Sequence, residues 1–368
     1  MKSLYVHIPF CAKKCLYCDF NSFSNRKLED EYIESLIKEI RLITDTEFET
    51  IFIGGGTPTI LSIHNLKLLL NSLDKFYPKE FTVECNPGTL TKENLTLMKS
   101  KGVNRLSIGL QSTHDRILKS LGRIHTYKEF LYGYNMSREV GFQNINIDLM
   151  FAVPGQGLEE FKESLQEVSK LNPEHISAYS LIVEEGTPFY EMKLKGELFV
   201  VDEDVEREMY DYLIEFLESK EYKWYEISNF AKDNLESLHN KAYWNGREYI
   251  GVGAGAHSYS NNRRYSNVKE IEQYIESINN GDGKNIEQEE YINKRAAMEE
   301  FMFLGLRMID GISKKEFLKR FSVCIESVYE DQLRRLQGLN LLSVEGDQIK
   351  LTRKGVNFSN SVFIEFIN

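Results

Sequence analysis

The sequence predicts an α/β fold, a partial (β/α)6 TIM-like barrel, followed by a small C-terminal winged-helix-like α+β domain. Three observations lead to this prediction. Short apolar runs alternate with amphipathic helical patterns from residue 3 to about 182, the pattern changes after that, and three helical patterns with a hairpin close the chain. A chain of 368 residues can form one large core and a smaller appended domain.

Six apolar runs have the length and composition of buried strands, with helical patterns between them. The predicted strands are 4–8, 50–53, 81–85, 105–110, 144–150 and 175–181, and the predicted helices are 31–43, 63–76, 92–101, 127–140 and 158–171. Such alternation makes a parallel sheet through right-handed crossovers. Ligands of these folds bind at the carboxyl ends of the strands.

Three of the five cysteines, Cys11, Cys15 and Cys18, follow the first predicted strand with the spacing C-x3-C-x2-C. Three thiolates on one loop would bind three irons of a cubane cluster and leave the fourth iron for an exchangeable ligand. A structural zinc with His7 or Asp19 as fourth ligand is the alternative. Zinc sites usually add a second, distant cysteine pair, and none follows here.

This cysteine spacing, after a short strand that ends in His-Ile-Pro-Phe, resembles the signature of the radical S-adenosylmethionine superfamily. The resemblance implies a [4Fe-4S] cluster on Cys11, Cys15 and Cys18. It also implies that S-adenosylmethionine chelates the fourth iron, and that a flavodoxin- or ferredoxin-like donor supplies the electron that cleaves the cofactor.

Polar residues mark the ends of the next predicted strands. A Gly-Gly-Gly-Thr-Pro-Thr segment at 54–59 follows the second strand, where missing side chains allow close approach to a ligand or simply form a tight turn. Glu84 stands at the exit of the third strand, Gln111 at the end of the fourth, and Asp148 within the fifth. Each alone could be a cap or an ion pair, but their repetition indicates a ligand site.

Over nearly the whole chain, the sequence resembles the oxygen-independent coproporphyrinogen oxidase group of radical S-adenosylmethionine proteins. The resemblance implies a C-terminal domain that covers the active site, in place of the DNA-binding role of many winged-helix modules. It also implies that nine residues contact S-adenosylmethionine: Tyr5, Tyr17, Gly55, Gly56, Thr57, Glu84, Gln111, Arg123 and Asp148.

The segment His239-Asn240-x-x-Tyr243-Trp244 resembles a hallmark of the HemW-type haem chaperone branch of this group. An imidazole beside Trp and Tyr can offer an axial nitrogen and a flat apolar wall to a metalloporphyrin. Equally, His239 could only tie down a loop. His257, in the glycine-rich segment 251–258, is a second candidate. These glycines do not open a helix as a dinucleotide fingerprint must, so we expect close backbone packing near the barrel mouth.

Two functional classes follow from the resemblance. A haem chaperone would bind the cluster, S-adenosylmethionine and haem or another tetrapyrrole, and pass haem to an acceptor protein, including transient contact with membrane-bound acceptors. An oxygen-independent oxidase would decarboxylate coproporphyrinogen III to protoporphyrinogen. Phe20 stands where the oxidases have a further cysteine, no extension precedes the first strand, and the 239–244 motif is present, which together favour the chaperone. Radical modification of haem is a third class. The sequence does not decide whether the protein is an enzyme.

Composition limits the remaining choices. A net charge of −11 without a Lys/Arg block argues against nucleic-acid binding. No apolar run approaches the ~18 residues of a membrane span and no signal peptide is recognisable, so we expect a cytoplasmic, reducing environment. The isolated Cys85 and Cys324 are expected to be small buried hydrophobes.

Three units are expected along the chain. Residues 1–185 would form the radical S-adenosylmethionine core, and 186–290 an extension that carries the 239–244 motif and the glycine-rich segment. Residues 291–368 would form the C-terminal domain, with helices at 293–308, 314–321 and 326–336 and a hairpin at 341–351.

Overall fold

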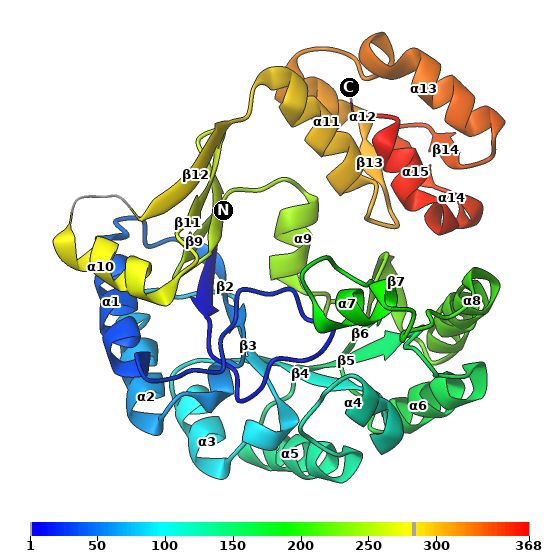
Figure 1. Ribbon diagram of the computed structural model, residues 1–368. Helices are drawn as coiled ribbons and strands as arrows, with labels where there is room; N and C mark the ends of the chain where they lie inside the picture. Colours follow the sequence, from blue (N-terminus) through cyan, green and yellow to red (C-terminus); the bar gives the residue numbers. More distant parts are fainter. Residues whose placement is uncertain (1, 282–284, 368) are drawn as a thin grey trace.

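The computed structural model describes residues 2–281 and 285–367, so three residues of the expected extension lie outside the described residues. Within the described part, a twelve-stranded sheet curls into an open barrel, and a separate three-stranded sheet belongs to the C-terminal domain (Figure 1). The order in the large sheet is β12-β11-β10-β9-β1-β2-β3-β4-β5-β6-β8-β7. No helix among these residues has the length and apolar character needed to cross a membrane.

The first six strands pair in parallel in chain order, which confirms the predicted β/α alternation. They are β1 (Lys2–Ile8), β2 (Phe48–Gly55), β3 (Glu80–Cys85), β4 (Arg105–Gln111), β5 (Ile145–Phe151) and β6 (His175–Ser180). The helices around them are α1 (Glu29–Leu42), α2 (Ile63–Ser72), α3 (Lys92–Ser100), α4 (Asp115–Ser120), α5 (Tyr127–Val140) and α6 (Leu158–Lys170).

The second strand is longer than the predicted 50–53. Its ladder with β1 continues through the pairs His7–Gly54 and Ile8–Gly55, so the first two glycines belong to the strand. Strand pairing, which local composition does not report, therefore decides where this strand ends.

The segment after β6 adds strands to both edges of the parallel sheet. On one edge, β7 (Lys223–Glu226) and β8 (Asn229–Ala231) continue from β6 in antiparallel fashion. On the other edge, β9 (Tyr249–Val252) pairs in parallel with β1 and leads to β10 (His257–Ser260), β11 (Arg263–Asn267) and β12 (Ile286–Tyr291). The helices of this segment are α7 (Pro188–Leu194), α8 (Glu203–Ser219), α9 (Leu238–Trp244) and α10 (Ile271–Asn280).

The glycines of segment 251–258 pack closely against neighbouring backbone, as expected. Gly253 has a φ of +99°, and a Cβ there would lie 2.6 Å from the Tyr32 hydroxyl and 2.7 Å from the His7 carbonyl oxygen. A Cβ on Gly251 would collide with the carbonyl of His257. Only glycine allows β9 and the turn after it to approach β1 and β10 so closely.

The C-terminal domain has the predicted winged-helix order of three helices and a hairpin. It contains α11 (Lys294–Gly305), β13 (Ile312–Ser313), α12 (Lys314–Phe321), α13 (Glu326–Gly338), β14 (Leu342–Glu345), β15 (Gln348–Leu351), α14 (Arg353–Asn357) and α15 (Ser359–Ile364). Its sheet has the antiparallel order β13-β15-β14, and it has a hydrophobic core of its own.

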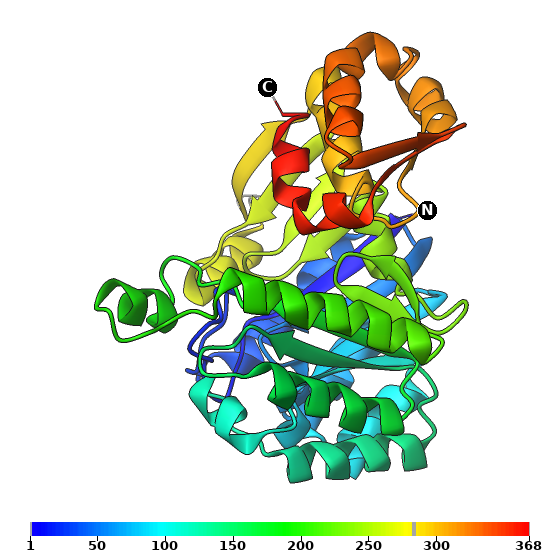
Figure 2. The same cartoon turned by 90° about the vertical axis from the view of Figure 1, so that its right-hand side faces the viewer.

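This domain contacts α9 and the β7–β8 hairpin. The backbone N–H of Ile309 donates to the Tyr225 carbonyl (3.1 Å), and Arg320 Nη2 donates to the Gly246 carbonyl (3.3 Å). In Figures 1 and 2 the domain, coloured orange to red, lies on the side where β1 begins, away from the loop that follows β1. The expectation that this domain covers the active site does not match a placement away from the loop after β1.

A buried carboxylate ties α1 to the added strands. Glu39 accepts four hydrogen bonds, from Tyr274 Oη (2.5 Å), Gly253 N (2.7 Å), Asn267 Nδ2 (2.8 Å) and Asn285 Nδ2 (2.9 Å). The donors come from the turn after β9, the end of β11, α10 and the residue before β12, so this one side chain ties the extension to the parallel core.

We therefore expect Glu39→Ala to lower the free energy of unfolding by about 3 kcal/mol, because buried donors lose their acceptor. Glu34→Ala is the matched control, since Glu34 is exposed on the same helix, and it should change stability by less than about 0.5 kcal/mol. Urea unfolding measures both. Equal stabilities of the two variants would contradict the role given to Glu39.

Candidate functional site

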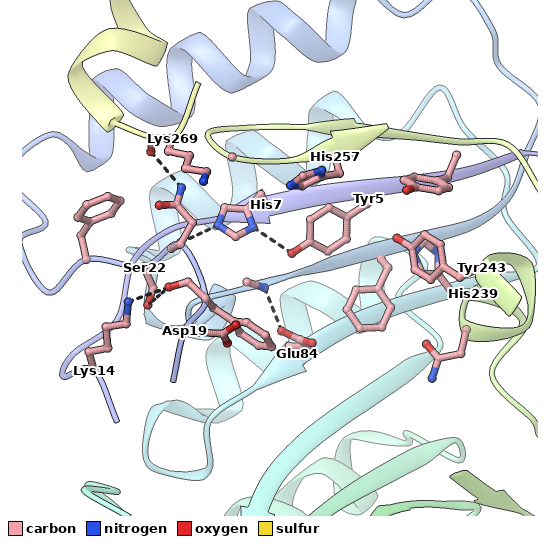
Figure 3. A pocket seen from close by; sticks show the side chains of 18 of the residues that line it. Tyr5, His7, Lys14, Asp19, Ser22, Glu84, His239, Tyr243, His257 and Lys269 are labelled. Atoms are coloured by element: carbon pink, nitrogen blue, oxygen red, sulfur yellow. Dashed lines mark hydrogen bonds between the residues drawn. The ribbon is translucent and has the colours of Figure 1, made fainter. Parts of the chain in front are cut away.

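A pocket of about 740 Å³ opens at the carboxyl ends of β1, β2 and β3 (Figure 3). One wall comes from these strands, a second from the loop after the cysteines, and a third from α9 and the added strands. Its polar and aromatic lining includes Tyr5, His7, Lys14, Asp19, Phe20, Phe52, Gly55, Glu84, His239, Asn240, Tyr243, Tyr249, His257 and Lys269. Of the nine residues expected around S-adenosylmethionine, Tyr5, Gly55 and Glu84 line this pocket.

The three motif cysteines lie on the loop directly after β1, all as free thiols. Cys11 is buried beside Thr57, whose hydroxyl donates to its sulfur (3.7 Å), and Arg123 Nη1 donates to the Cys15 sulfur (3.6 Å). Burial raises the pKa of the Cys18 thiol to about 11 and also raises the pKa of Cys11. Binding of iron would therefore displace protons from these thiols.

The donor set fits a cluster better than a single zinc ion. Among the described residues, no three His, Cys, Asp or Glu side chains converge on one metal position. His7 has no free nitrogen, because Tyr5 Oη donates to its Nδ1 (2.9 Å) and its Nε2 donates to the Asn21 carbonyl (2.8 Å). A cubane needs no such convergence, since each cysteine binds a different iron.

The glycines after β2 lie directly against the cysteine loop. Gly55 has a φ of +109°, and a Cβ there would lie 2.6 Å from His7 Nδ1. A Cβ on Gly56 would lie 2.5 Å from the Phe10 carbonyl oxygen and 3.0 Å from the Cys11 sulfur. The missing side chains thus permit the close approach that the sequence predicts, and the neighbour they admit is the cysteine loop itself.

Two acidic side chains face the barrel interior next to this loop. Glu84 accepts from the Gly55 N–H (3.0 Å), while Asp148 accepts from Asn146 Nδ2 (2.7 Å) and Ser107 Oγ (3.3 Å). Burial, and then the charge of Asp148, raises the pKa of Glu84 to about 8. Burial also raises the pKa of Asp148.

A buried cation lies below these acids. Arg105, at the start of β4, is 2% exposed, and its Nε and Nη2 have no hydrogen-bond partner within the described residues. Its charge lowers the pKa of both Glu84 and Asp148, although burial outweighs it. Arg105 therefore offsets part, but not all, of the cost of burying the two carboxylates.

Tyr17, Gln111 and Arg123 gather at the end of β4. Arg123 Nη2 donates to the Gly109 carbonyl (2.6 Å), and its guanidinium lies beside Tyr17 and Cys15. Gln111 has a φ of +74°, rare for a residue with a side chain and typical of functional sites. The nine expected residues thus do not share one level of the barrel. Tyr5 and Asp148 lie in the middle of β1 and β5, and the other seven lie at the carboxyl ends of β2–β4 or in the segments that follow β1, β2 and β4: Tyr17, Gly55, Gly56, Thr57, Glu84, Gln111 and Arg123.

His239 is fully committed to hydrogen bonds. It is 1% exposed, its Nδ1 donates to Thr50 Oγ1 (2.7 Å), and its Nε2 accepts from Tyr243 Oη (3.0 Å). The ring stacks on Phe52 at 5.0 Å between centroids, and burial lowers its pKa to about 3. In this arrangement His239 connects α9 to β2. This is the structural role that the sequence analysis gave as the alternative to haem binding.

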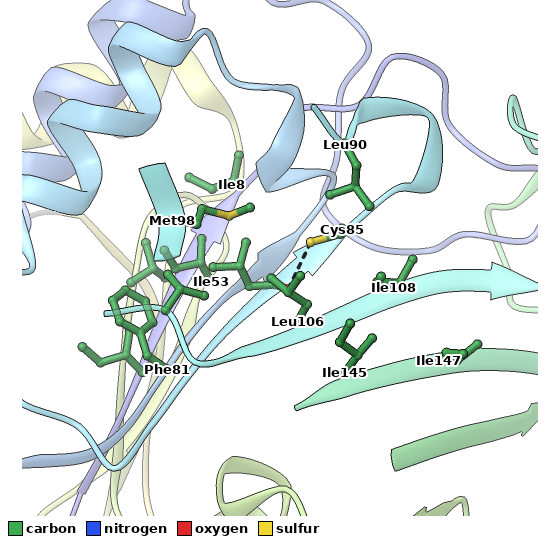
Figure 4. Packing of buried hydrophobic residues seen from close by; sticks show 14 of the residues in the cluster. Ile8, Ile53, Phe81, Cys85, Leu90, Met98, Leu106, Ile108, Ile145 and Ile147 are labelled. Atoms are coloured by element: carbon green, nitrogen blue, oxygen red, sulfur yellow. Dashed lines mark hydrogen bonds between the residues drawn. The ribbon is translucent and has the colours of Figure 1, made fainter. Parts of the chain in front are cut away.

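The two isolated cysteines have different surroundings. Cys85 lies in the hydrophobic core between Ile53, Leu106 and Ile108, as expected (Figure 4). Cys324 is exposed, so the prediction of burial was wrong there. It lies between α12 and α13, directly after a turn in which Ser322 adopts a left-handed conformation, and this turn faces solvent.

Several pocket residues were not predicted. Phe52 could have been found from strand alternation, because it points to the same face as Thr50. Tyr249 and Lys269 could not, since the β1–β9 pairing and the contact of Asn21 with the Lys269 carbonyl, which bring them to the pocket, leave no mark in the local sequence.

Comparisons with known proteins support the resemblance. Residues 5–168 match the family model described as Radical SAM superfamily, and residues 292–358 match the HemN C-terminal domain. A curated relative, Heme chaperone HemW of Bacillus subtilis (strain 168), is 40% identical over 100% of this chain and 99% of its own length. The chain belongs to the HemW family of radical SAM proteins. The HemW of Escherichia coli (strain K12) is 32% identical over 99% of this chain and 98% of its own length.

One solved structure shows that this chain has the fold of an oxidase. The coproporphyrinogen III oxidase (HemN) from Escherichia coli, described as a radical SAM enzyme, superposes with a TM-score of 0.85 and 23% identity, covering 99% of this chain and 89% of that chain. At this identity the likeness shows the shared fold, and it confirms the predicted core and C-terminal domain.

The raised pKa of Glu84 predicts a pH-dependent stability for the ligand-free protein. Folding favours the protonated form of Glu84. Between pH 4.5 and about pH 8, this residue therefore binds more protons in the folded state than in the unfolded state. The free energy of unfolding should then fall with rising pH across this window, by about 1 kcal/mol per unit from this group. Glu84→Gln should remove this contribution to the pH dependence of the free energy of unfolding. Glu93→Gln, which changes an exposed glutamate, should leave the pH dependence unchanged. Parallel pH profiles for wild type and Glu84→Gln would refute the assignment.

Proposed function

We propose that this protein is a haem chaperone, which binds a [4Fe-4S] cluster and S-adenosylmethionine at the cysteine loop and holds haem in the adjoining pocket for transfer to an acceptor protein. The observation that carries the proposal is the full-length, 40% identity to a relative named Heme chaperone HemW. The pocket beside the cysteine loop supplies a place for the cargo.

Cys11, Cys15 and Cys18 would hold the cluster. When bound and reduced, the cluster supplies an electron that can cleave S-adenosylmethionine. Arg123, beside Cys15, suits the carboxylate of that cofactor, while the Gly55–Thr57 turn lies against Cys11, where the cofactor's amino group would come. Reduction requires a donor of flavodoxin or ferredoxin type.

Glu84, Asp148, Gln111, Tyr5 and Tyr17 would complete this site. Glu84 and Asp148 offer acceptors to ribose hydroxyl or amino groups, and an arriving cation favours the ionised form of both acids. Binding would therefore release a proton from Glu84, whose pKa is near 8 without ligand.

Haem fits the character of the pocket. Tyr5, Phe52, Tyr243 and Tyr249 supply flat aromatic surface, and Lys14 and Lys269 supply positive charge for propionates. Phe20 lines the same pocket and is 56% exposed. Where the oxidases carry a further cysteine, this chain therefore offers only a hydrocarbon ring.

The first test concerns the cluster. After anaerobic reconstitution with iron and sulfide, wild type should show the visible charge-transfer absorption of an iron–sulfur cluster, and Cys15→Ala should lose most of it. Cys324→Ala is the matched control, because Cys324 is exposed and outside the loop, and it should match wild type. An unchanged spectrum in Cys15→Ala would refute the ligand assignment.

The second test separates chaperone from oxidase. Reconstituted protein is incubated anaerobically with S-adenosylmethionine, dithionite and coproporphyrinogen III, and in parallel with haem, while tetrapyrrole mass and 5′-deoxyadenosine are followed. We expect bound haem of unchanged mass and intact coproporphyrinogen. Loss of two carboxyl groups would make the protein an oxidase and overturn the proposal, and a new haem mass would instead identify haem modification.

A further inference from the structure

We propose that His257 is the axial ligand of haem iron in this pocket. The inference rests on the proposed haem-binding function and assigns the ligand to a residue outside the 239–244 motif. It follows from a comparison of the histidines that line the pocket, from the rigidity of the strand that carries His257, and from the charge beside it.

Three histidines line the pocket: His7, His239 and His257. Both ring nitrogens of His7 are hydrogen-bonded, as are both nitrogens of His239. To bind iron, either ring would have to break a buried hydrogen bond and leave its partner unpaired. His257 is exposed, lies on the pocket surface, and makes no side-chain hydrogen bond within the described residues (Figure 3).

Other ligand types are scarce around the pocket. No cysteine or methionine is among its lining residues. The hydroxyl of Tyr5 donates to His7, and that of Tyr243 donates to His239. The hydroxyl of Tyr249, the third tyrosine of the lining, lies beside Arg264. Among the histidines of the pocket, His257 is thus the one whose ring nitrogens make no hydrogen bond within the described residues.

The backbone at His257 is held firmly. The residue opens β10 and pairs with Ser266 across the β10–β11 hairpin, while Gly251 packs directly on its carbonyl. A ligand on a packed strand keeps its ring position better than one on a loop. Partial burial and the nearby charge of Lys269 also lower the pKa of His257, which keeps the imidazole neutral and able to bind metal at neutral pH.

The residues near His257 suit the propionates and the porphyrin ring of haem. Lys269, exposed at the pocket rim, places a positive charge near the ring, where a propionate could pair with it. The aromatic side chains of Tyr5 and Tyr249 line the same wall. A single ligand at an exposed edge also suits transfer, because release of haem requires the exchange of only one protein–iron bond.

The test is a haem titration of the full-length, reconstituted protein, with the cluster spectrum subtracted. Wild type should give the absorption and electron paramagnetic resonance signature of histidine-ligated ferric haem. His257→Ala should weaken binding at least about tenfold, equivalent to about 1.4 kcal/mol, and change that signature. Added imidazole should restore it.

Two matched variants make the result specific. His64→Ala changes an exposed histidine outside the pocket and should behave as wild type. His239→Ala should keep the ligand signature of wild type, whatever its effect on stability, and circular dichroism shows that each variant is folded.

The outcomes are distinguishable. Haem binding by His257→Ala with unchanged affinity and signature would overturn the ligand assignment and leave the chaperone proposal standing. Loss of the signature in His239→Ala but not in His257→Ala would assign the ligand to the motif histidine instead. Failure of the wild type to bind haem would overturn the proposed function, and the ligand assignment with it.

Discussion

The arrangement of this molecule depends on a buried carboxylate at the base of the third strand. Glu80 accepts hydrogen bonds from Ser237 Oγ (3.3 Å) and from the backbone N–H groups of Leu238 (2.8 Å) and His239 (3.0 Å), at the first turn of α9. A carboxylate at a helix N-terminus is electrostatically favourable. It holds α9 in the opening that six parallel strands leave unfilled, against β1 and β2. The helix then turns Asn240 and Tyr243 toward the pocket, while Trp244 stacks under Arg307 of the C-terminal domain at 4.3 Å.

The mouth of the barrel is divided into two regions that share one acid. On one side lie the cysteine loop, Arg123 and Gln111, and on the other lies the pocket with its aromatic wall. Glu84 faces both, since it accepts from the glycine turn, lines the pocket and feels the charge of Asp148. A ligand bound on either side therefore changes the electrostatic environment of the other through this carboxyl group.

The sequence predicted the parts that local pattern encodes. Strand–helix alternation predicted β1 to β6, and the apolar run before the cysteines placed Cys11, Cys15 and Cys18 on the loop after β1, where the structure has them. The roles proposed for these cysteines, Glu84 and Asp148 stay predictions. Pattern could not predict contacts between distant segments: His239 meets Thr50, 189 positions away, and this contact decides what its ring can do. Strand β12 was missed for a different reason, because it is exposed along its whole length and carries no apolar alternation.

The hydrogen bonds of Asn21 set an order of maturation. Its Nδ2 donates to the carbonyls of Ala254 (3.1 Å) and Lys269 (3.0 Å), and these bonds hold the end of the cysteine loop in place. A ribosome makes the cysteines first and these partners much later, after most of the chain. While the chain is being synthesised, the thiols are thus present on a loop that lacks its final supports. The cysteine loop therefore gains these supports only after the chain has been made as far as Lys269, about three quarters of its length.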